Sequence, residues 1–236
     1  MRTLKFSNVV YGVAQLAGLD RDNLPTHFFK QVRDLANPRM ALAWETEYWP
    51  DLLRISELTV TTTDSVSTIA YPTNAGEILE VCSKNPRKTT IRAGVGFILY
   101  DDGTDSDTNS GKTITVFTTT SPLYVEYRIN RPTLTGDVWV NSSYASGAQA
   151  YYSGDFYTAN TGTATSFTPS EWDKVLMPKI FESYLVRGIY ADYLRANGQP
   201  DIAVAEDQNA EAVITLEADK LYRQQGQVRR ANVLVY

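Results

Sequence analysis

The side chains that carry most enzyme chemistry are scarce in this sequence. It holds one histidine, His27, and one cysteine, Cys82. His27 follows Pro-Thr at a predicted helix start, and Cys82 lies beside Val81 in a strand-like run, where a cysteine acts as a small apolar residue. The sequence contains no Gly-x-x-x-x-Gly-Lys-Ser/Thr loop, no Gly-x-Ser-x-Gly elbow and no His-Glu-x-x-His motif. We therefore predict that the chain is not an enzyme and has no catalytic residues.

One acidic segment has the composition of a cation site. Residues 101–111 read Asp-Asp-Gly-Thr-Asp-Ser-Asp-Thr-Asn-Ser-Gly, and oxygen ligands at alternate positions suit a hard cation such as Ca²⁺. The glycine and the closing glutamate of an EF-hand loop are not at the required spacings. We interpret Asp101 to Asn109 as a hairpin loop, with Ca²⁺ binding as the alternative, and predict no metal site and no cofactor. Paired carboxylates for glycoside hydrolysis stay open, but nothing selects a pair.

Composition limits the partners and the compartment. The formal net charge of −5 gives no basic face to displace counterions from phosphates, which argues against a general nucleic-acid binder. A single cysteine excludes an internal disulfide framework. No apolar run approaches the ~18–20 residues of a membrane helix, and the apolar residues between Val9 and Leu19 recur at helical spacing, unlike a signal peptide. We expect a cytoplasmic origin and no membrane partner.

Helical spacing of apolar residues predicts helices at both ends of the chain, over 1–58 and over 177–226. Within the first range one helix covers 26–36, and Asn37-Pro38 is expected to end it and to start another. Each predicted helix has a single apolar stripe, so none is stable alone in water. The helices of the two ends are therefore expected to pack together.

The middle of the chain changes to short β-branched or aromatic runs separated by turn residues. Such spacing predicts an antiparallel sheet or a small sandwich over 59–136. The runs lie at 59–63, 78–82, 89–92, 97–100, 113–118 and 123–129. Residues 137–176 are poor in aliphatic side chains and rich in Tyr, Trp, Gly, Ser and Thr, which predicts a second and smaller β unit.

The last predicted helix has an apolar face and an acidic face. The apolar residues expected to face the core are Ile202, Ala205, Ala212, Val213, Leu216 and Leu221. The acidic residues expected to face water are Glu206, Asp207, Glu211, Glu217 and Asp219. The economical arrangement is an α+β fold, in which the N- and C-terminal helices form one helical bundle with the antiparallel β region inserted. Residues 227–236 then form an extended arm.

The segment 137–176 resembles the small chitin-binding-type carbohydrate-binding modules. The matching residues are Trp139, Tyr144, Gly154, Asp155, Tyr157, Ala159, Pro169 and Trp172. The match departs from that pattern at Phe156, and one short strand is missing. The resemblance implies that Trp139, Tyr144, Tyr157 and Trp172 stack on sugar rings; the alternative is that they form the small core of the unit.

Three runs in chain order resemble head–tail connector (adaptor or neck) proteins of tailed bacteriophages. They are Asn37-Pro-Arg-x₄-Trp44-Glu-x₃-Trp49-Pro50, then Tyr124-Val-Glu-Tyr-Arg-x₃-Pro132-x-Leu134-x-Gly136, and finally Tyr184-x₅-Tyr190-Ala-Asp-Tyr-Leu194. The resemblance implies a structural virion protein in the neck, made in the host cytoplasm. It implies a homo-oligomeric ring, typically a dodecamer, that contacts the portal protein and tail or neck proteins. Genomic DNA would pass through without specific binding.

Two features of the sequence fit that implied role. The chain ends in an apolar segment after a basic pair, and such an end needs burial against a partner or against its own domain. We predict that a portal-docking arm contains Arg229, Arg230, Val233, Leu234, Val235 and Tyr236. The five acidic residues of the last helix are a candidate lining for a DNA conduit, because carboxylates repel phosphates; the alternative is an ordinary solvated face. A glycan-binding tail or decoration protein is the alternative function.

Overall fold

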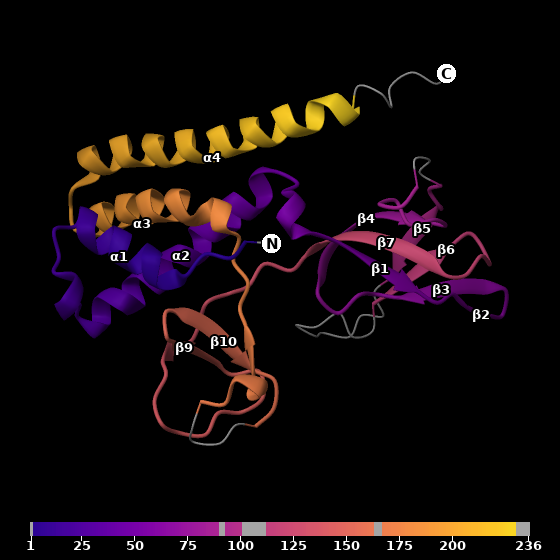
Figure 1. The fold of residues 1–236 in the computed structure, drawn as a ribbon, viewed down its shortest axis with the longest axis horizontal. Coiled ribbons are helices and arrows are strands. Elements are labelled where there is room, and N and C mark those ends of the chain that lie inside the picture. Colours follow the sequence, from indigo (N-terminus) through magenta and orange to yellow (C-terminus); the bar gives the residue numbers. More distant parts are fainter. Residues whose placement is uncertain (1, 90–92, 101–111, 163–166, 230–236) are drawn as a thin grey trace. The chain divides into compact units, whose positions relative to one another are not determined.

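The structure, a computed structural model, describes residues 2–89, 93–100, 112–162 and 167–229 and has a mixed α+β fold (Figure 1). The α-helices are α1 Phe6–Leu16, α2 Thr26–Thr46, α3 Glu182–Ala196 and α4 Pro200–Arg229. Short 3₁₀ helices cover Arg21–Asn23, Pro50–Leu52, Pro169–Glu171 and Lys179–Phe181. The strands are β1 Leu53–Leu58, β2 Thr61–Thr63, β3 Val66–Ala70, β4 Ala75–Cys82, β5 Phe97–Tyr100, β6 Thr113–Val116, β7 Leu123–Ile129, β8 Asp137–Val138, β9 Gln149–Tyr152, β10 Asp155–Ala159 and β11 Trp172–Lys174.

The chain divides into two compact units. Unit 1 contains both ends of the chain, residues 1–47 and 132–236, and unit 2 contains residues 48–131. Unit 2 is therefore an insertion between the second helix and the rest of unit 1. The sequence placed the start of the β region at 59, but the strand β1 already begins at Leu53, so the predicted helical range 1–58 is wrong over its last residues.

The helix α3 contacts each of the other three helices of unit 1 (Figure 1). Close approach of α1 and α3 depends on Gly12, because a Cβ atom there would lie 2.8 Å from the side chain of Val186. The buried apolar side chains of these helices are Phe6, Val9, Val10, Val13, Ala14, Phe28, Phe29, Val32, Ala36, Met40, Ala43, Trp44, Leu185, Ile189, Ala191 and Leu194. Their burial supplies the main favourable term for this part of the fold.

The helix α2 continues through Pro38, so the predicted break at Asn37-Pro38 is wrong. The side chain of Asn37 does not cap a new helix. Its amide nitrogen donates to the carbonyl oxygen of Leu134 at 2.9 Å, and its amide oxygen accepts from the Leu134 amide at 2.8 Å. Pro38 is exposed, and its ring removes only one backbone hydrogen bond from a helix held by packing on its opposite face.

The smaller β unit forms a four-stranded sheet in the order β11-β10-β9-β8 and belongs to unit 1. Backbone hydrogen bonds join it to the N-terminal segment, from Ser7 N to Gly154 O and from Leu4 N to Met177 O, each 3.0 Å long. Aromatic rings form a second junction, where Phe6 of α1 lies with its centroid 4.9 Å from that of Phe156. This unit is therefore packed against the helices, and residues 137–176 are not an isolated module.

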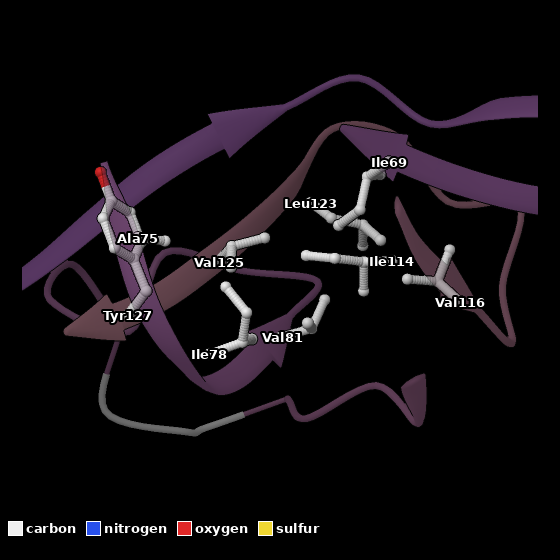
Figure 2. Close-up of a cluster of buried hydrophobic side chains, with 9 residues drawn as sticks. All are labelled: Ile69, Ala75, Ile78, Val81, Ile114, Val116, Leu123, Val125 and Tyr127. Carbon is white, nitrogen blue, oxygen red and sulfur yellow. The ribbon is translucent and has the colours of Figure 1, made fainter. Parts of the chain in front are cut away.

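Unit 2 contains two sheets, ordered β1-β7-β4 and β2-β3-β6-β5, with antiparallel pairing throughout. Both sheets contribute to one buried cluster (Figure 2). Its members are Ile69, Ala75, Ile78, Val81, Ile114, Val116, Leu123, Val125 and Tyr127. The predicted small antiparallel β region is confirmed. The expected run 59–63 contains β2, while Thr89 lies outside any strand and 90–92 fall outside the described residues.

The chain enters and leaves unit 2 through adjacent strands. Leu53, the first residue of β1, is the cross-strand partner of Arg128 near the end of β7. Directly opposed residues in an antiparallel pair have Cβ atoms about 5 Å apart. The two connections to unit 1 therefore start from neighbouring points of unit 2.

Candidate functional site

The helix α4 has an exposed face with apolar residues at spacings of three and four. Ile202 and Leu216 are 55% and 52% exposed, although the sequence predicted that both face the core. Residues at these spacings share one side of a helix. We call this side the outer stripe of α4; it consists of Ile202, Ala205, Asn209, Ala212 and Leu216. Two large exposed apolar side chains on one helix side, joined by small residues, suit a surface that contacts a partner.

The opposite face of α4 is built from small side chains. Ala203, Ala210, Ile214 and Ala218 are buried, and α4 packs along α3. Alanine allows two helices to approach closely, so this face fits against α3 better than the larger residues of the outer stripe. The predicted orientation of the helix was wrong because both faces are apolar. Hydrophobicity alone favoured the side with isoleucine and leucine.

Ion pairs fix the same orientation. Glu206 accepts a hydrogen bond from Arg187 of α3 at 3.0 Å, and Asp207 pairs with Arg39 of α2 at 2.7 Å and with Arg195 of α3. Both carboxylates are half-buried. The prediction that Glu206 and Asp207 belong to a free acidic face is therefore wrong, since cations on the neighbouring helices hold them against the body of unit 1.

The remaining acidic candidates behave differently. Glu211 and Asp219 are exposed, as predicted. Glu217 is half-buried and accepts a hydrogen bond from Lys220 on the same helix at 2.6 Å. Only two of the five predicted acidic residues, Glu211 and Asp219, are therefore exposed, and of these only Asp219 follows Leu216 of the outer stripe at a spacing of three.

Arg39 joins three helices and is 8% exposed. Its Nε and one Nη donate to the two carboxylate oxygens of Asp192, each at 2.6 Å. The hydrogen bond to Asp192, together with the pairing to Asp207, raises the pKa of Arg39 although burial opposes this. Burial also acts to raise the pKa of Asp207, but hydrogen bonds from Arg195 and Arg39 lower it below its ordinary value. Arg39 and Asp207 therefore remain charged over the physiological pH range.

The sequence analysis did not identify Arg39 as a buried, paired residue, although its position in the helix pattern indicates this. Arg39 follows Val32 and Ala36 at spacings of seven and three, on the side of the helix that also carries Met40 and Ala43. A charged residue within an apolar stripe must be paired when it is buried. That position therefore predicts an ion pair with another helix, although it does not identify Asp192.

The four aromatic candidates for sugar stacking lie in and around a core. Trp172 is 4% exposed, and Trp139, Tyr144 and Tyr157 pack against it while half-buried or partly exposed. Phe167 stacks on Trp172 with ring centroids 5.5 Å apart and planes at 17°. The reading of Trp172 as an open sugar platform is wrong, because neighbouring rings cover it. So small a unit has few other apolar side chains from which to build a core.

Other predictions concern residues about which the structure describes little. The predicted extended arm 227–236 is wrong over 227–229, because α4 continues to Arg229. The arm residues Arg230, Val233, Leu234, Val235 and Tyr236 lie outside the described residues, and so does the side chain of Arg229. The candidate Ca²⁺ loop from Asp101 to Asn109 also lies outside them. His27 is exposed, and Cys82 is buried.

The described residues contain no cluster of three or more His, Cys, Asp or Glu placed to hold a metal ion. None of the described helices is long and apolar enough to cross a membrane. No protein-family model matches the chain, and no curated protein matches it significantly. The outer stripe of α4 is an exposed surface of unit 1 that is suited to contact a partner.

Proposed function

We propose that the chain is a structural protein of a tailed-phage virion, a ring-forming head–tail connector that links the portal to the tail. In this proposal the helices from both ends of the chain act as one bundle. The observation that carries it is the outer stripe of α4, which leaves Ile202 and Leu216 exposed on a helix already packed against α3. The order of the connector-like sequence runs supports the same assignment.

The outer stripe contacts the helices of the neighbouring copy in the proposed ring. Its residues are mostly small or apolar, so two helices can approach closely, and burial of the exposed half of Ile202 and of Leu216 contributes about 1–1.5 kcal/mol each. Repetition of one such contact closes a ring when the rotation between copies closes. Residues 230–236 dock on the portal protein, and tail or neck proteins bind the opposite side.

Glu211 and Asp219 of α4 are exposed; Asp219 borders the outer stripe, and Glu211 lies on the side of Val204. In the proposed ring they contribute negative charge to the DNA conduit, where repulsion of phosphates lets the genome pass without specific binding. Glu206 and Asp207 have no part in this, because arginines neutralise them. The assembled ring belongs to the virion neck.

Substitution on the two exposed sides of α4 tests the proposal. Leu216→Glu places a charge in the outer stripe and is expected to prevent formation of the closed ring in sedimentation or native mass measurements. Val204→Glu is the matched control, because Val204 is also 52% exposed but lies on another side of the same helix. The control is expected to assemble like the unsubstituted chain. Equal assembly of both variants would contradict the role of the outer stripe.

The link to the portal needs a separate measurement. Deletion of residues 230–236 is expected to abolish binding to portal rings of the same virion while the folded chain keeps its helical circular dichroism. Full retention of portal binding after the deletion would count against the docking arm. A chain that never forms a closed oligomer would count against the connector as a whole.

A further inference from the structure

The sheet β2-β3-β6-β5 of unit 2 has two short edge strands that contain no charged side chain and no proline. Within the described part of the chain β5 pairs only with β6, and β2 pairs only with β3. Proteins normally protect such edges with charged side chains, proline or bulges. The strands read Thr61-Thr-Thr63 and Phe97-Ile-Leu-Tyr100, without a charge or a proline in either.

The apolar side of this sheet extends beyond the core at β5. Leu99 lies opposite Ile114, which is completely buried, so both side chains point to the core side of the sheet. Figure 2 shows Ile114 among the core side chains. Leu99 is nevertheless 48% exposed. An additional strand beside β5 would extend the covered surface over Leu99.

One hydrogen bond shows which backbone groups of β5 point toward β6 and which point away from the sheet. The Phe117 amide donates to the carbonyl oxygen of Gly96 at 3.1 Å. Since bonded and non-bonded pairs alternate in an antiparallel ladder, Ile98 and Tyr100 bond to β6. The amide and carbonyl groups of Phe97 and Leu99 therefore point away from the sheet.

The same reasoning applies at β2. Asp64 and Ser65 form the two-residue turn between β2 and β3, both with positive φ, and Thr63 is paired with Val66 next to the turn. Thr63 is the bonded partner in such a hairpin, so the backbone groups of Thr62 point outward. The side chain of Thr62 lies on the core side, beside the buried Ser67.

The two edges are complementary to each other. Along the sheet each strand runs opposite to its neighbours, so β2 and β5 are antiparallel. If the backbone groups of Thr62 in one copy form hydrogen bonds with those of Leu99 in another, both side chains lie on the side of the shared sheet that faces the core. In a chain of net charge −5, these uncharged edges can also approach without repulsion between like charges.

We propose that a second copy of this chain adds its β2 edge to β5, so that neighbouring copies share one antiparallel sheet. The contact is head to tail and leaves a free β5 and a free β2 at the two ends of a pair. It goes beyond the proposed connector function, does not need the portal, and is compatible with a ring because head-to-tail contacts repeat.

Hydrogen exchange of the full chain over a concentration series provides the direct test. In the assembled state, the amides of Thr62, Phe97 and Leu99 are expected to exchange about tenfold or more slowly than in the monomer. Assembly without protection at these amides would overturn the shared sheet and leave the connector proposal intact. Protection of both edges in a chain that does not bind portal rings would support the shared sheet and contradict the connector proposal.

Paired variants test the direction of the contact in the Leu216→Glu background, which removes the proposed α4 contact. Leu99→Lys disables the β5 edge, and Thr62→Lys disables the β2 edge. Each variant alone is expected to be monomeric. An equimolar mixture is expected to form one-to-one dimers, because one variant keeps an intact β5 edge and the other an intact β2 edge. Val66→Lys is the matched control, because Val66 is 49% exposed on the inner strand β3. Association of Thr62→Lys by itself, or of Leu99→Lys by itself, would overturn the head-to-tail arrangement.

Discussion

Arg39 of α2 and Asp192 of α3 form a two-pronged ion pair, with both donor–acceptor distances at 2.6 Å. The pair lies at the junction of three helices, because Arg39 also reaches Asp207 of α4. Gly188 leaves room for the guanidinium, since a Cβ atom there would lie 2.9 Å from Cδ of Arg39. This junction fixes which side of α4 remains exposed.

The ion pair predicts a measurable stability loss. Arg39→Met removes the cation and leaves two partly buried carboxylates with fewer partners, which is expected to cost about 2–3 kcal/mol in the free energy of unfolding. Lys220→Met is the control, since Lys220 belongs to an exposed pair with an expected effect below about 0.5 kcal/mol. Chemical denaturation of both variants measures the difference, and equal losses would contradict the special role of Arg39.

Asp207 predicts a pH dependence of stability. Its pKa is lower in the folded chain than the unfolded value of about 3.9, so its ionised form stabilises the fold above that value. This contribution is lost as the pH falls through the folded pKa. Asp207→Asn is therefore expected to lower the melting temperature at pH 7 but to match the unsubstituted chain more closely near pH 2–3. A constant difference across this range would contradict the prediction.

The aromatic core of the smaller β unit predicts that Trp172 acts in folding. Trp172→Ala is expected to destabilise the fold by about 3–5 kcal/mol, because it leaves a cavity among Tyr144 and Phe167. Tyr152→Ala is the control, since Tyr152 is partly exposed at the margin of the cluster. Thermal unfolding measures both. A Trp172→Ala chain of unchanged stability that loses binding on a glycan array would restore the sugar-binding interpretation.

Gly136 predicts a steric effect before β8. A Cβ atom at this position would lie 2.7 Å from the backbone carbon of Gln149, and backbone cannot move away as a side-chain end can. Gly136→Ala is therefore expected to destabilise the β8–β9 pairing by about 1–3 kcal/mol. At Gly162 a Cβ atom meets nothing within 4 Å, so Gly162→Ala is the matched control. Limited proteolysis of residues 137–162 compares the two variants.

The general fold class was predictable because the period of the apolar residues changes along the chain. Short β-branched runs identified much of unit 2, and helical spacing identified α1 and most of α2. The strand β1 was missed because it directly follows Pro50–Leu52, a helical turn that continues the preceding pattern. Pro38 misled the prediction because contacts with Leu134 outweigh a local signal.

The candidate surfaces were harder to predict than the elements. On α4 the sequence shows two apolar sides, and only the close approach of α3 selects the alanine side. Glu206 and Asp207 looked solvated because their arginine partners lie on other helices, and the spacing along α4 does not reveal them. The edge position of β5 depends on the order of the strands, which the spacing of apolar residues does not encode.

The opposed positions of Leu53 and Arg128 have a consequence for how this chain can vary. Because Leu53 and Arg128 are opposed, a short linker can join them in place of the residues between them without stretching the chain on either side. The gene can thus lose, exchange or enlarge this segment while the host scaffold keeps its own connectivity. A shortened chain of this kind offers a direct route to studying unit 1 alone.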